Sequence, residues 1–322
     1  MSVATSSEPV ADVRRYEPRV VNCYTLFDKF FPTCGMLDYT EGMYFGDPKV
    51  PYETAQLNQI NYVLDEVGCT EGLRVLEIGC GNGNLMEEIR RRGALGVGIT
   101  ISPEQTALCR ARGLDVRTLD YKLLDEDYFE KFDVVVANGP IEHFVQARDA
   151  ARGLTEDVYR HMFDLFHRAI DPNSSNRRFI NTTIHFLRTP DPKDLLASPW
   201  SHKRGSDNWH WAWLARAFGG FYPTMGQFER LTQGRFQLVK TLDGTQDYCW
   251  TSEEWLRRVR AALRSWTGAK IFAKSLPFAM LHAKQTFDML MCMMGSESWN
   301  WQFRGPNAPT CLLRQTWDYV PA

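Results

Sequence analysis

Short apolar runs recur along the 322-residue chain at the spacing of buried β-strands that are separated by helices. The runs that we interpret as strands are residues 74–78, 96–101, 115–119, 132–137, 178–186, 236–242 and 310–314. Strands that alternate with helices at this pitch form βαβ units and a parallel sheet. The pattern therefore predicts an α/β fold with a doubly wound, seven-stranded, mostly parallel sheet of Rossmann-like architecture.

Amphipathic segments between these runs predict the helices that cover the sheet. The predicted helices are residues 52–67, 84–92, 155–170 and 251–263, together with one that begins at Pro103. Ser102 would cap that last helix, with Pro103 at its first position. Thr251, with Glu254 three residues on, has the spacing of a capping box and predicts the start of the helix at 251.

Two long blocks, residues 188–235 and 264–309, interrupt the alternation and read as irregular, aromatic-rich insertions. Most of the ten tryptophans lie between Trp200 and Trp301, and five methionines fall in the second block. We expect the two blocks to cover an apolar substrate. The methionines at 289–294 would form either a helix core or a wall of the substrate site.

Composition and charge exclude several classes of protein. Thirty-seven Lys and Arg against 39 Asp and Glu give a net charge of −2, so the chain has no general electrostatic attraction to nucleic acid. No apolar run reaches the ~18–20 residues of a membrane span, and residues 1–8 lack the pattern of a signal peptide. The eight cysteines contain no Cys-x-x-Cys pair. We therefore expect a cytoplasmic protein with reduced thiols, no metal site and no integral membrane association.

The strongest chemical signal is a glycine-rich loop directly after the first predicted strand. Residues 77–83 read Glu-Ile-Gly-Cys-Gly-Asn-Gly and precede a predicted helix. Gly79, Gly81 and Gly83 would let the backbone approach a ligand, with free amides at the helix start facing it. A dinucleotide-binding fold would carry an acid about 20 residues later, where residues 98–102 read Gly-Ile-Thr-Ile-Ser. The loop predicts a cofactor other than NAD.

The position of Glu77 ahead of the three glycines resembles the first motif of the class I S-adenosylmethionine-dependent methyltransferases. In that group the glycines pass under the methionyl part of the cofactor and the acid supports its amino group. Asp120, after the third strand, matches the acid that contacts adenine, and Tyr121 lies beside it. Asn138 and Gly139, after the fourth strand, complete the expected cofactor site. The resemblance implies S-adenosyl-L-methionine as cofactor.

Three further segments resemble the cyclopropane fatty acid synthase and mycolic acid synthase group. Residues 98–105 match its G-x-T-x-S-x-x-Q segment, in which Thr100 and Gln105 take over part of cofactor recognition. Residues 139–144 are similar to its G-x-F-E-H-F segment, and residues 247–255 to its H-Y-x-x-T-x-x-x-W segment. The resemblance covers the chain from about residue 39 to residue 314.

That group adds the methyl carbon of its cofactor to an alkene, and a bicarbonate held by Cys, Glu, His and Tyr takes a proton from the resulting carbocation. Carried onto this chain, the Glu falls on Glu142 and the Tyr on Tyr248. The Cys position falls on Gly42 and the His position on Asn181, so two of the four differ. Two interpretations follow: methyl transfer to a double bond with Glu142 assisting proton loss, or ring closure with bicarbonate.

Other side chains are candidates at the same site. His143 follows Glu142 directly, Glu142 is expected to share a hydrogen bond with Tyr248, and His185 is a candidate to replace the missing histidine. Aromatic faces stabilise adjacent cations. The predicted substrate-binding residues are therefore aromatic: Tyr44, Phe45, Trp209, Trp213 and Phe221.

A basic run bears on the substrate's head group. It comprises Arg177, Arg178, Arg188, Lys193, Lys203 and Arg204. Such a run is either a solvated face or a dock for a phosphate, a diphosphate or an acidic carrier protein. The expected substrate is an apolar small molecule of lipid or isoprenoid type, phosphorylated or carrier-bound if the second interpretation holds. O- or N-methylation of a small aromatic metabolite and a catalytically silent cofactor-binding protein are the alternatives, and the oligomeric state stays open.

These assignments divide the chain into consecutive parts. The predicted parts are a flexible N-terminus (residues 1–15), an N-terminal helical cover (16–70), a cofactor-binding core (71–187), a substrate-cover insertion (188–235) and the C-terminal part of the core (236–322), which holds a second insertion (264–309).

Overall fold

A single seven-stranded sheet organises the protein, whose computed structural model describes residues 18–36 and 38–321. The strand order is β3-β2-β1-β4-β5-β7-β6. The bounds are β1 Arg74–Ile78, β2 Leu95–Thr100, β3 Val116–Thr118, β4 Val134–Asn138, β5 Arg178–Phe186, β6 Phe236–Asp243 and β7 Thr310–Tyr319. Only β7 runs antiparallel to its neighbours β5 and β6. The predicted mostly parallel sheet is confirmed, whereas the prediction for residues 1–15 lies outside the described residues.

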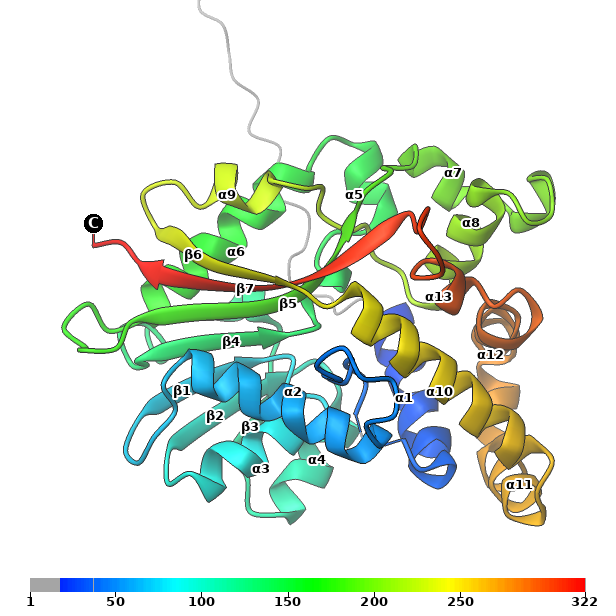
Figure 1. Cartoon of the computed structure of the whole chain (residues 1–322), viewed down its shortest axis with the longest axis horizontal. Coiled ribbons are helices and arrows are strands. Elements are labelled where there is room, and N and C mark those ends of the chain that lie inside the picture. The colour runs from blue at the N-terminus through cyan, green and yellow to red at the C-terminus, as the bar shows by residue number, and fades with distance from the viewer. Residues whose placement is uncertain (1–17, 37, 322) are drawn as a thin grey trace, which may run out of the picture.

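Helices cover both faces of the sheet (Figure 1). Their bounds are α1 Pro18–Phe30, α2 Tyr52–Glu66, α3 Asn84–Arg91, α4 Pro103–Ala111, α5 Ala147–Ala151, α6 Thr155–Ala169, α7 Pro192–Leu196, α8 Asp207–Ala217, α9 Gln227–Leu231, α10 Thr245–Leu263, α11 Trp266–Leu281, α12 Ala283–Leu290 and α13 Ser298–Trp301. Successive residues of a strand point to opposite faces. Val134 and Val136 of β4 accordingly join the core under α2, α3 and α4, and Val135 joins the larger core on the other face.

The two interrupting blocks are helical rather than irregular, which corrects the sequence interpretation. The first contains α7, α8 and α9, and the second contains α11, α12 and α13, with a π-helical turn at Met291–Gly295. Helix α8 buries Trp209 and Trp213, which are one turn apart and in contact, and also Trp211, which is two residues from each. A helix that is apolar nearly all round has no amphipathic period to detect.

Helix α10 begins at Thr245, so the predicted start at Thr251 and its capping box are wrong. The Thr251 hydroxyl lies inside the helix, where it donates to the Asp247 carbonyl at 2.8 Å and accepts from the Gly42 amide at 2.8 Å. The side chain that looked like a cap instead fastens residues 38–45 to α10. The described helices are each too short or too polar to span a lipid bilayer.

A buried arginine joins three parts of the fold. Arg314 of β7, completely enclosed, bonds through Nε to Glu41 Oε1 and through Nη1 to Asp247 Oδ2, both at 2.9 Å. Its Nη2 donates to the Gly42 carbonyl at 3.2 Å. Strand β7 extends to Tyr319, past the predicted end at residue 314, because its polar residues are buried by such contacts and do not read as an apolar run.

We predict that Arg314→Met destabilises the protein by about 3–5 kcal/mol, because it leaves two buried carboxylates without their partner. Urea unfolding followed by circular dichroism measures the change. The matched control is Arg257→Met, since the Arg257 side chain is 66% exposed and forms its ion pair with Glu254 on the same helix. The control should change stability by no more than about 0.5 kcal/mol, and equal losses in the two variants would contradict the role given to Arg314.

Candidate active site

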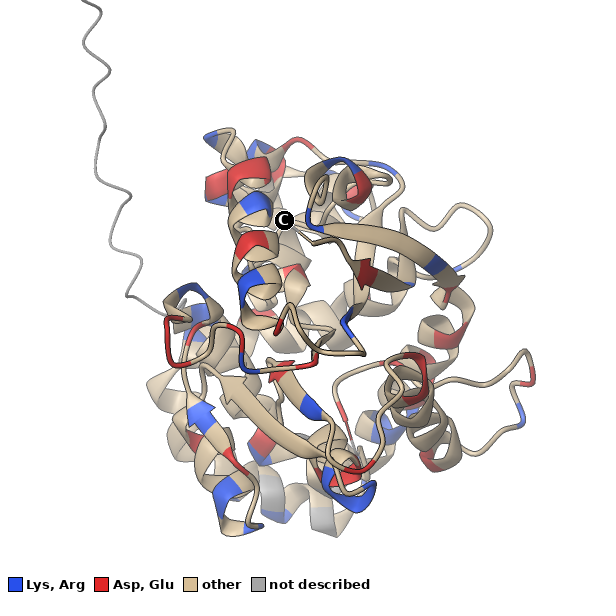
Figure 2. Cartoon of the chain, turned by 90° about the vertical axis from the view of Figure 1, so that its left-hand side faces the viewer, with Lys and Arg blue, Asp and Glu red and all other residues tan. Residues whose placement is uncertain are grey.

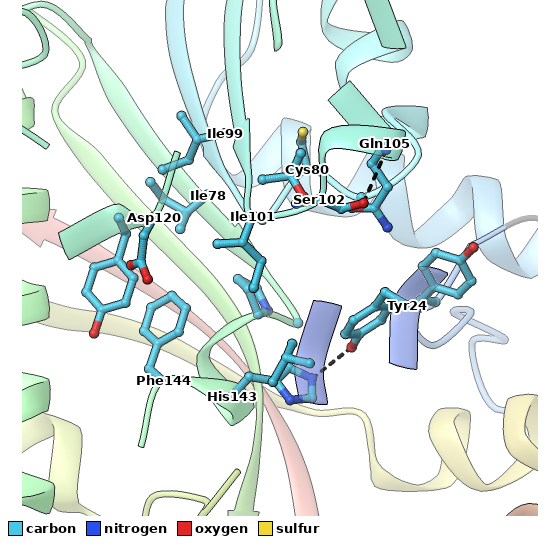
Figure 3. A pocket seen from close by; sticks show the side chains of 18 of the residues that line it. Tyr24, Ile78, Cys80, Ile99, Ile101, Ser102, Gln105, Asp120, His143 and Phe144 are labelled. Carbon is cyan, nitrogen blue, oxygen red and sulfur yellow. Dashed lines mark hydrogen bonds between the residues drawn. The ribbon is translucent and has the colours of Figure 1, made fainter. Parts of the chain in front are cut away.

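A cavity lies at the carboxyl ends of β1, β2, β3 and β4, and we call it the loop cavity (Figure 3). Nine of the ten predicted cofactor residues line it: Glu77, Gly79, Gly81, Thr100, Gln105, Asp120, Tyr121, Asn138 and Gly139. Parallel sheets of this kind place their ligands at this edge. Residues predicted from four separate strand ends and the helix after β2 therefore line one cavity.

The glycine loop has a left-handed backbone at each glycine, with φ of 70° at Gly79, 50° at Gly81 and 76° at Gly83. A Cβ at Gly79 would lie 2.5 Å from Pro140 Cβ, so the next loop of the site requires a glycine there. A Cβ at Gly83 would lie 2.7 Å from Cys109 Sγ of α4. Gly83 therefore serves the packing of α3 against α4 and does not line the cavity, which corrects its assignment.

Acidic and amide groups give the loop cavity its polarity. Glu77 is 3% exposed, and its Oε2 has no hydrogen-bond partner among the described residues. Burial raises the pKa of Glu77 well above its usual value. The Thr100 hydroxyl donates to Gln105 Oε1 at 2.7 Å, and the Lys122 amide donates to Asp120 Oδ1 at 3.0 Å. An unpartnered buried carboxylate oxygen in a cavity wall suits a cationic group on a ligand.

Helix α1 and the segment after it line one side of the loop cavity, within the N-terminal cover predicted for residues 16–70, although no residue of this segment was predicted to line the site. Tyr24, Asp38 and Tyr39 line it from this side. The Tyr39 hydroxyl bonds to Asp28 of α1 and accepts from Asn82 Nδ2 of the glycine loop at 2.9 Å. The signal in the sequence that could have identified these residues is the density of aromatic side chains in this segment, which include Tyr24, Phe27 and Tyr39.

A second cavity, which we call the inner cavity, adjoins the first. The two share Tyr24, Tyr39, Thr40, Gly139 and His143. The wall of the inner cavity is largely aromatic, and the remaining aromatic residues in it are Phe218, Tyr222, Tyr248 and Trp299. Glu41, Glu142 and Thr182 supply its further polar atoms. The inner cavity is therefore a largely aromatic compartment with two carboxylates, and it adjoins the loop cavity through the shared residues.

Glu142 is the buried, unpaired acid of the inner cavity. Its Oε1 accepts from the Ile184 amide at 2.8 Å, and its Oε2 has no hydrogen-bond partner within the described parts of the chain. Burial raises the pKa of Glu142 to about 8, with a further contribution from Glu41. Tyr248 lines the same cavity. The predicted hydrogen bond between Glu142 and Tyr248 is wrong, since a backbone amide of β5 holds the carboxylate instead.

His143 is a neutral, buried histidine between the two cavities. Its Nε2 lies 2.7 Å from the Tyr24 hydroxyl, a contact drawn in Figure 3. Burial lowers the pKa of His143 to about 4, so the ring carries no charge at neutral pH. The geometry makes His143 a positioning partner of Tyr24.

Asn181 and His185 lie outside both cavities, which corrects their predicted roles. Asn181 Oδ1 accepts from Trp317 Nε1 at 2.8 Å, and His185 Nδ1 lies 3.0 Å from the Thr183 carbonyl. Successive side chains of a strand alternate between faces, and the residues of β5 that line the inner cavity are Thr182 and Ile184.

The residues present do not fit the bicarbonate that the family resemblance implies. Gly42 has no room for a side chain, because a Cβ there would lie 2.8 Å from Ala55 Cβ. Its amide is taken by Thr251. Glu41, the preceding residue, lines the inner cavity and adds a second carboxylate that repels an anion. With Asn181 turned away, only Glu142 and Tyr248 remain of the expected four.

The predicted substrate residues are aromatic but none lines either cavity. Tyr44 packs against Trp250, with ring centroids 5.5 Å apart, and Phe45 is 70% exposed. Trp209 and Trp213 are buried against one another, and Phe221 packs against Phe186. Other aromatic residues of the two interrupting blocks, Phe218, Tyr222 and Trp299, do line the inner cavity. The prediction thus selected the correct blocks but the wrong residues, because composition does not give the direction of a side chain.

The basic run does not form one dock. Arg177 and Arg178 lie at the start of strand β5 and the other four basic residues follow its end. The length of the strand separates the two groups by about 27 Å, at ~3.3 Å per residue. Arg178 pairs with Asp318 at one end and Arg188 with Asp207 at the other. On the face shown in Figure 2, basic and acidic residues are interspersed. Across residues 18–36 and 38–321, no group of His, Cys, Asp and Glu is arranged to hold a metal ion.

Comparison with known proteins agrees with this geometry. The family described as mycolic acid cyclopropane synthetase matches residues 12–270. Cyclopropane-fatty-acyl-phospholipid synthase of Escherichia coli (strain K12) is 28% identical over 216 residues, which cover 65% of this chain and 48% of that protein. The chain thus spans about half the length of this curated relative.

Two solved structures share the fold. The cyclopropane synthase MmaA2 from Mycobacterium tuberculosis superposes with a TM-score of 0.69 at 20% identity, over 95% of this chain and 99% of that one. The mycolic acid cyclopropane synthase CmaA1, in a complex with SAH and CTAB, gives a TM-score of 0.69 at 19% identity, over 94% of this chain and 98% of that one.

We predict that Gly81→Val lowers the affinity for S-adenosylhomocysteine at least tenfold. The new side chain would project toward the loop cavity, where a Cβ would have only Tyr39 at 3.9 Å, from a left-handed backbone position. Isothermal titration calorimetry measures the loss. Gly72→Val is the matched control, because Gly72 has a φ of 79° and no atom within 4 Å of its Cβ position. Wild-type affinity in Gly81→Val would remove the loop from the ligand site.

Proposed function

Since the chain belongs to the mycolic acid cyclopropane synthetase family, we propose that it is an S-adenosylmethionine-dependent C-methyltransferase acting on a carbon–carbon double bond of a lipid or isoprenoid-like substrate. The observation that carries the proposal is the inner cavity, where the buried carboxylate of Glu142 and a wall of aromatic rings adjoin the loop cavity. No nucleic acid or metal has a part in it.

The loop cavity suits S-adenosylmethionine. Gly79 and Gly81 present backbone to the ligand, Glu77 offers an unpartnered oxygen to the cofactor's amino group, and Asp120 and Gln105 provide polar contacts for the adenosine. The bound cofactor would supply an electrophilic methyl group on a cationic sulfur.

The inner cavity suits the other reactant and the cation that follows. A π-bond that takes up a methyl group needs no base beforehand and becomes a carbocation. Faces of Tyr24, Tyr222 and Trp299 stabilise such a cation through their quadrupoles. Glu142 then accepts the proton from the neighbouring carbon on its unpartnered oxygen, and the electron pair of that C–H bond restores the double bond. A positive charge nearby lowers the pKa of the carboxyl group and favours its ionised form.

Tyrosine hydroxyls in the cavity walls stay protonated. Burial raises the pKa of Tyr248 well above its usual value, and Glu142 and Glu41 add to the effect. The hydroxyls of this wall are therefore donors that do not compete with the alkene for the methyl group. Because these residues are buried, water is kept from the cation.

We predict that Glu142→Gln lowers turnover by about 10²-fold, the effect typical of a general base, with unchanged affinity for S-adenosylhomocysteine. The assay follows release of S-adenosylhomocysteine with unsaturated phospholipids, acyl thioesters and prenyl compounds. Proton NMR of the product separates a methyl branch or methylene group from a cyclopropane. Glu126→Gln, at a side chain 88% exposed, is the matched control and should keep the wild-type rate. Undiminished turnover in Glu142→Gln would exclude the role of base.

The raised pKa of Glu142 also predicts a pH-dependent difference in stability. The folded protein keeps the Glu142 proton up to about pH 8, whereas the unfolded chain releases it near the usual value of 4.5. The folded state binds more protons across this window, so the stability contributed by this group falls as pH rises through it. Urea unfolding should find Glu142→Gln increasingly more stable than wild type from pH 5 to pH 8, and a constant difference would contradict the buried neutral carboxyl.

A further inference from the structure

Helix α11 exposes its apolar side to solvent. Trp266, Met280 and Leu281 are 78%, 70% and 79% exposed, and Phe272 and Leu276 more than 40%. Its main contacts are with α1, α10, α12 and the turn after α1. Figure 1 shows α11 and α12 at one end of the molecule, away from the sheet. A surface helix normally turns its apolar side inward, so this exposed side calls for an apolar partner.

The exposed apolar residues continue onto α12 through Phe287 and Leu290, which are 50% and 44% exposed. We call these residues and those of α11 the α11–α12 face. A patch of several large apolar side chains on one surface marks an interaction site.

The charge on this face is positive only. Residues 264–287 contain Arg264, Lys270, Lys274 and Lys284 and no acidic residue, in a chain whose net charge is −2. Lys270 and Lys274 are exposed on α11. The next acid, Asp288, is buried and pairs with Arg216 and Lys284. A partner that covers this face would therefore have a negatively charged surface.

An apolar groove runs beside the face, between α1, α10, α11 and α12. Leu263, Phe272 and Met289 are among its lining residues. Phe27 of α1 lies in its floor, and the same ring packs against Phe218, a wall of the inner cavity, with centroids 5.6 Å apart. The wall of the groove and the wall of the inner cavity are therefore in contact through the rings of Phe27 and Phe218.

We propose that the α11–α12 face docks on a lipid bilayer that contains anionic lipid, and that the groove receives a hydrocarbon chain from it. An interfacial helix combines an apolar face with lysines beside it, and tryptophan favours the boundary between lipid and water. Trp266, Lys270 and Lys274 provide both features on α11. The proposal that the groove receives a hydrocarbon chain rests on the proposed function, because it assumes a lipid substrate. The proposal that the face docks on a bilayer does not depend on that function.

Vesicle flotation with the full chain tests the docking. We expect binding to vesicles of phosphatidylcholine with 30% phosphatidylglycerol, weakened by salt, and little binding to phosphatidylcholine alone. Lys270→Glu with Lys274→Glu, and separately Met280→Asp with Leu281→Asp, should each reduce binding at least tenfold. Leu108→Asp on α4, where Leu108 is 48% exposed, is the matched control and should bind as wild type. Calorimetry with S-adenosylhomocysteine checks that each variant is folded.

Two results would overturn the docking proposal. One is wild-type vesicle binding by both face variants. The other is light scattering that finds a dimer which both variants convert to a monomer, with no vesicle binding by wild type, since the face would then join two copies of this chain. The two proposals fail separately. Face-dependent vesicle binding without methylation of any lipid would refute the proposed function alone, and turnover on dispersed substrate without vesicle binding would refute the docking alone.

Discussion

The site is held together by a charge that has no contact with water: the Arg314 guanidinium, which binds Glu41 and Asp247 inside the protein. The desolvation of such a group is compensated only when all its donors find partners. Here those partners come from the segment 38–45 and from α10, so that β7 sets the position of both. The same segment carries Tyr39 and Thr40 into the two cavities. One ion cluster therefore fixes the relation between the glycine loop and the compartment beside it.

Glu41 and Glu142 face the same compartment in different electrostatic states. Glu41 has a cationic partner at 2.9 Å, whereas Glu142 has only the Ile184 amide and holds its proton up to about pH 8. Two carboxylates that share a site push the pKa of one of them upward. The arrangement leaves one carboxylate held in an ion pair with Arg314 and one group that has no cationic partner and can release or accept a proton. Such a compartment disfavours a bound anion and favours a ligand or intermediate with positive charge.

Local sequence patterns predicted what depends on local structure. The strand before the glycine loop, the turn at its glycines and the position of Asp120 at the end of β3 agree with the sequence prediction, because backbone conformation and strand ends are encoded within a few residues. Glu142 was located because it follows β4 directly. The site residues that were wrongly predicted on strand β5 were missed because the sequence does not give the direction of a side chain. Asn181 and Thr182 are neighbours on β5, and only the pleat, fixed by pairing with β4 and β7, decides which reaches the cavity.

Helix α10 was predicted to begin too late for a related reason. Thr251 has the sequence signal of a helix cap, but its hydroxyl lies inside the helix and bonds to Gly42, which is distant in the sequence. Likewise, the aromatic content of α8 did not show which rings would be enclosed by other helices.

The position of the Phe27 ring bears on how fast a substrate could enter the inner cavity. Its ring lines the groove and contacts Tyr24, Tyr39 and Phe218, which line the inner cavity. A hydrocarbon chain that passed from the groove to the inner cavity along this contact would have to displace the ring from its packed position. Entry is then a gated step, governed by the frequency of a side-chain motion inside the core and insensitive to the reactivity of the double bond. In an enzyme built this way the slowest event need not be a chemical one.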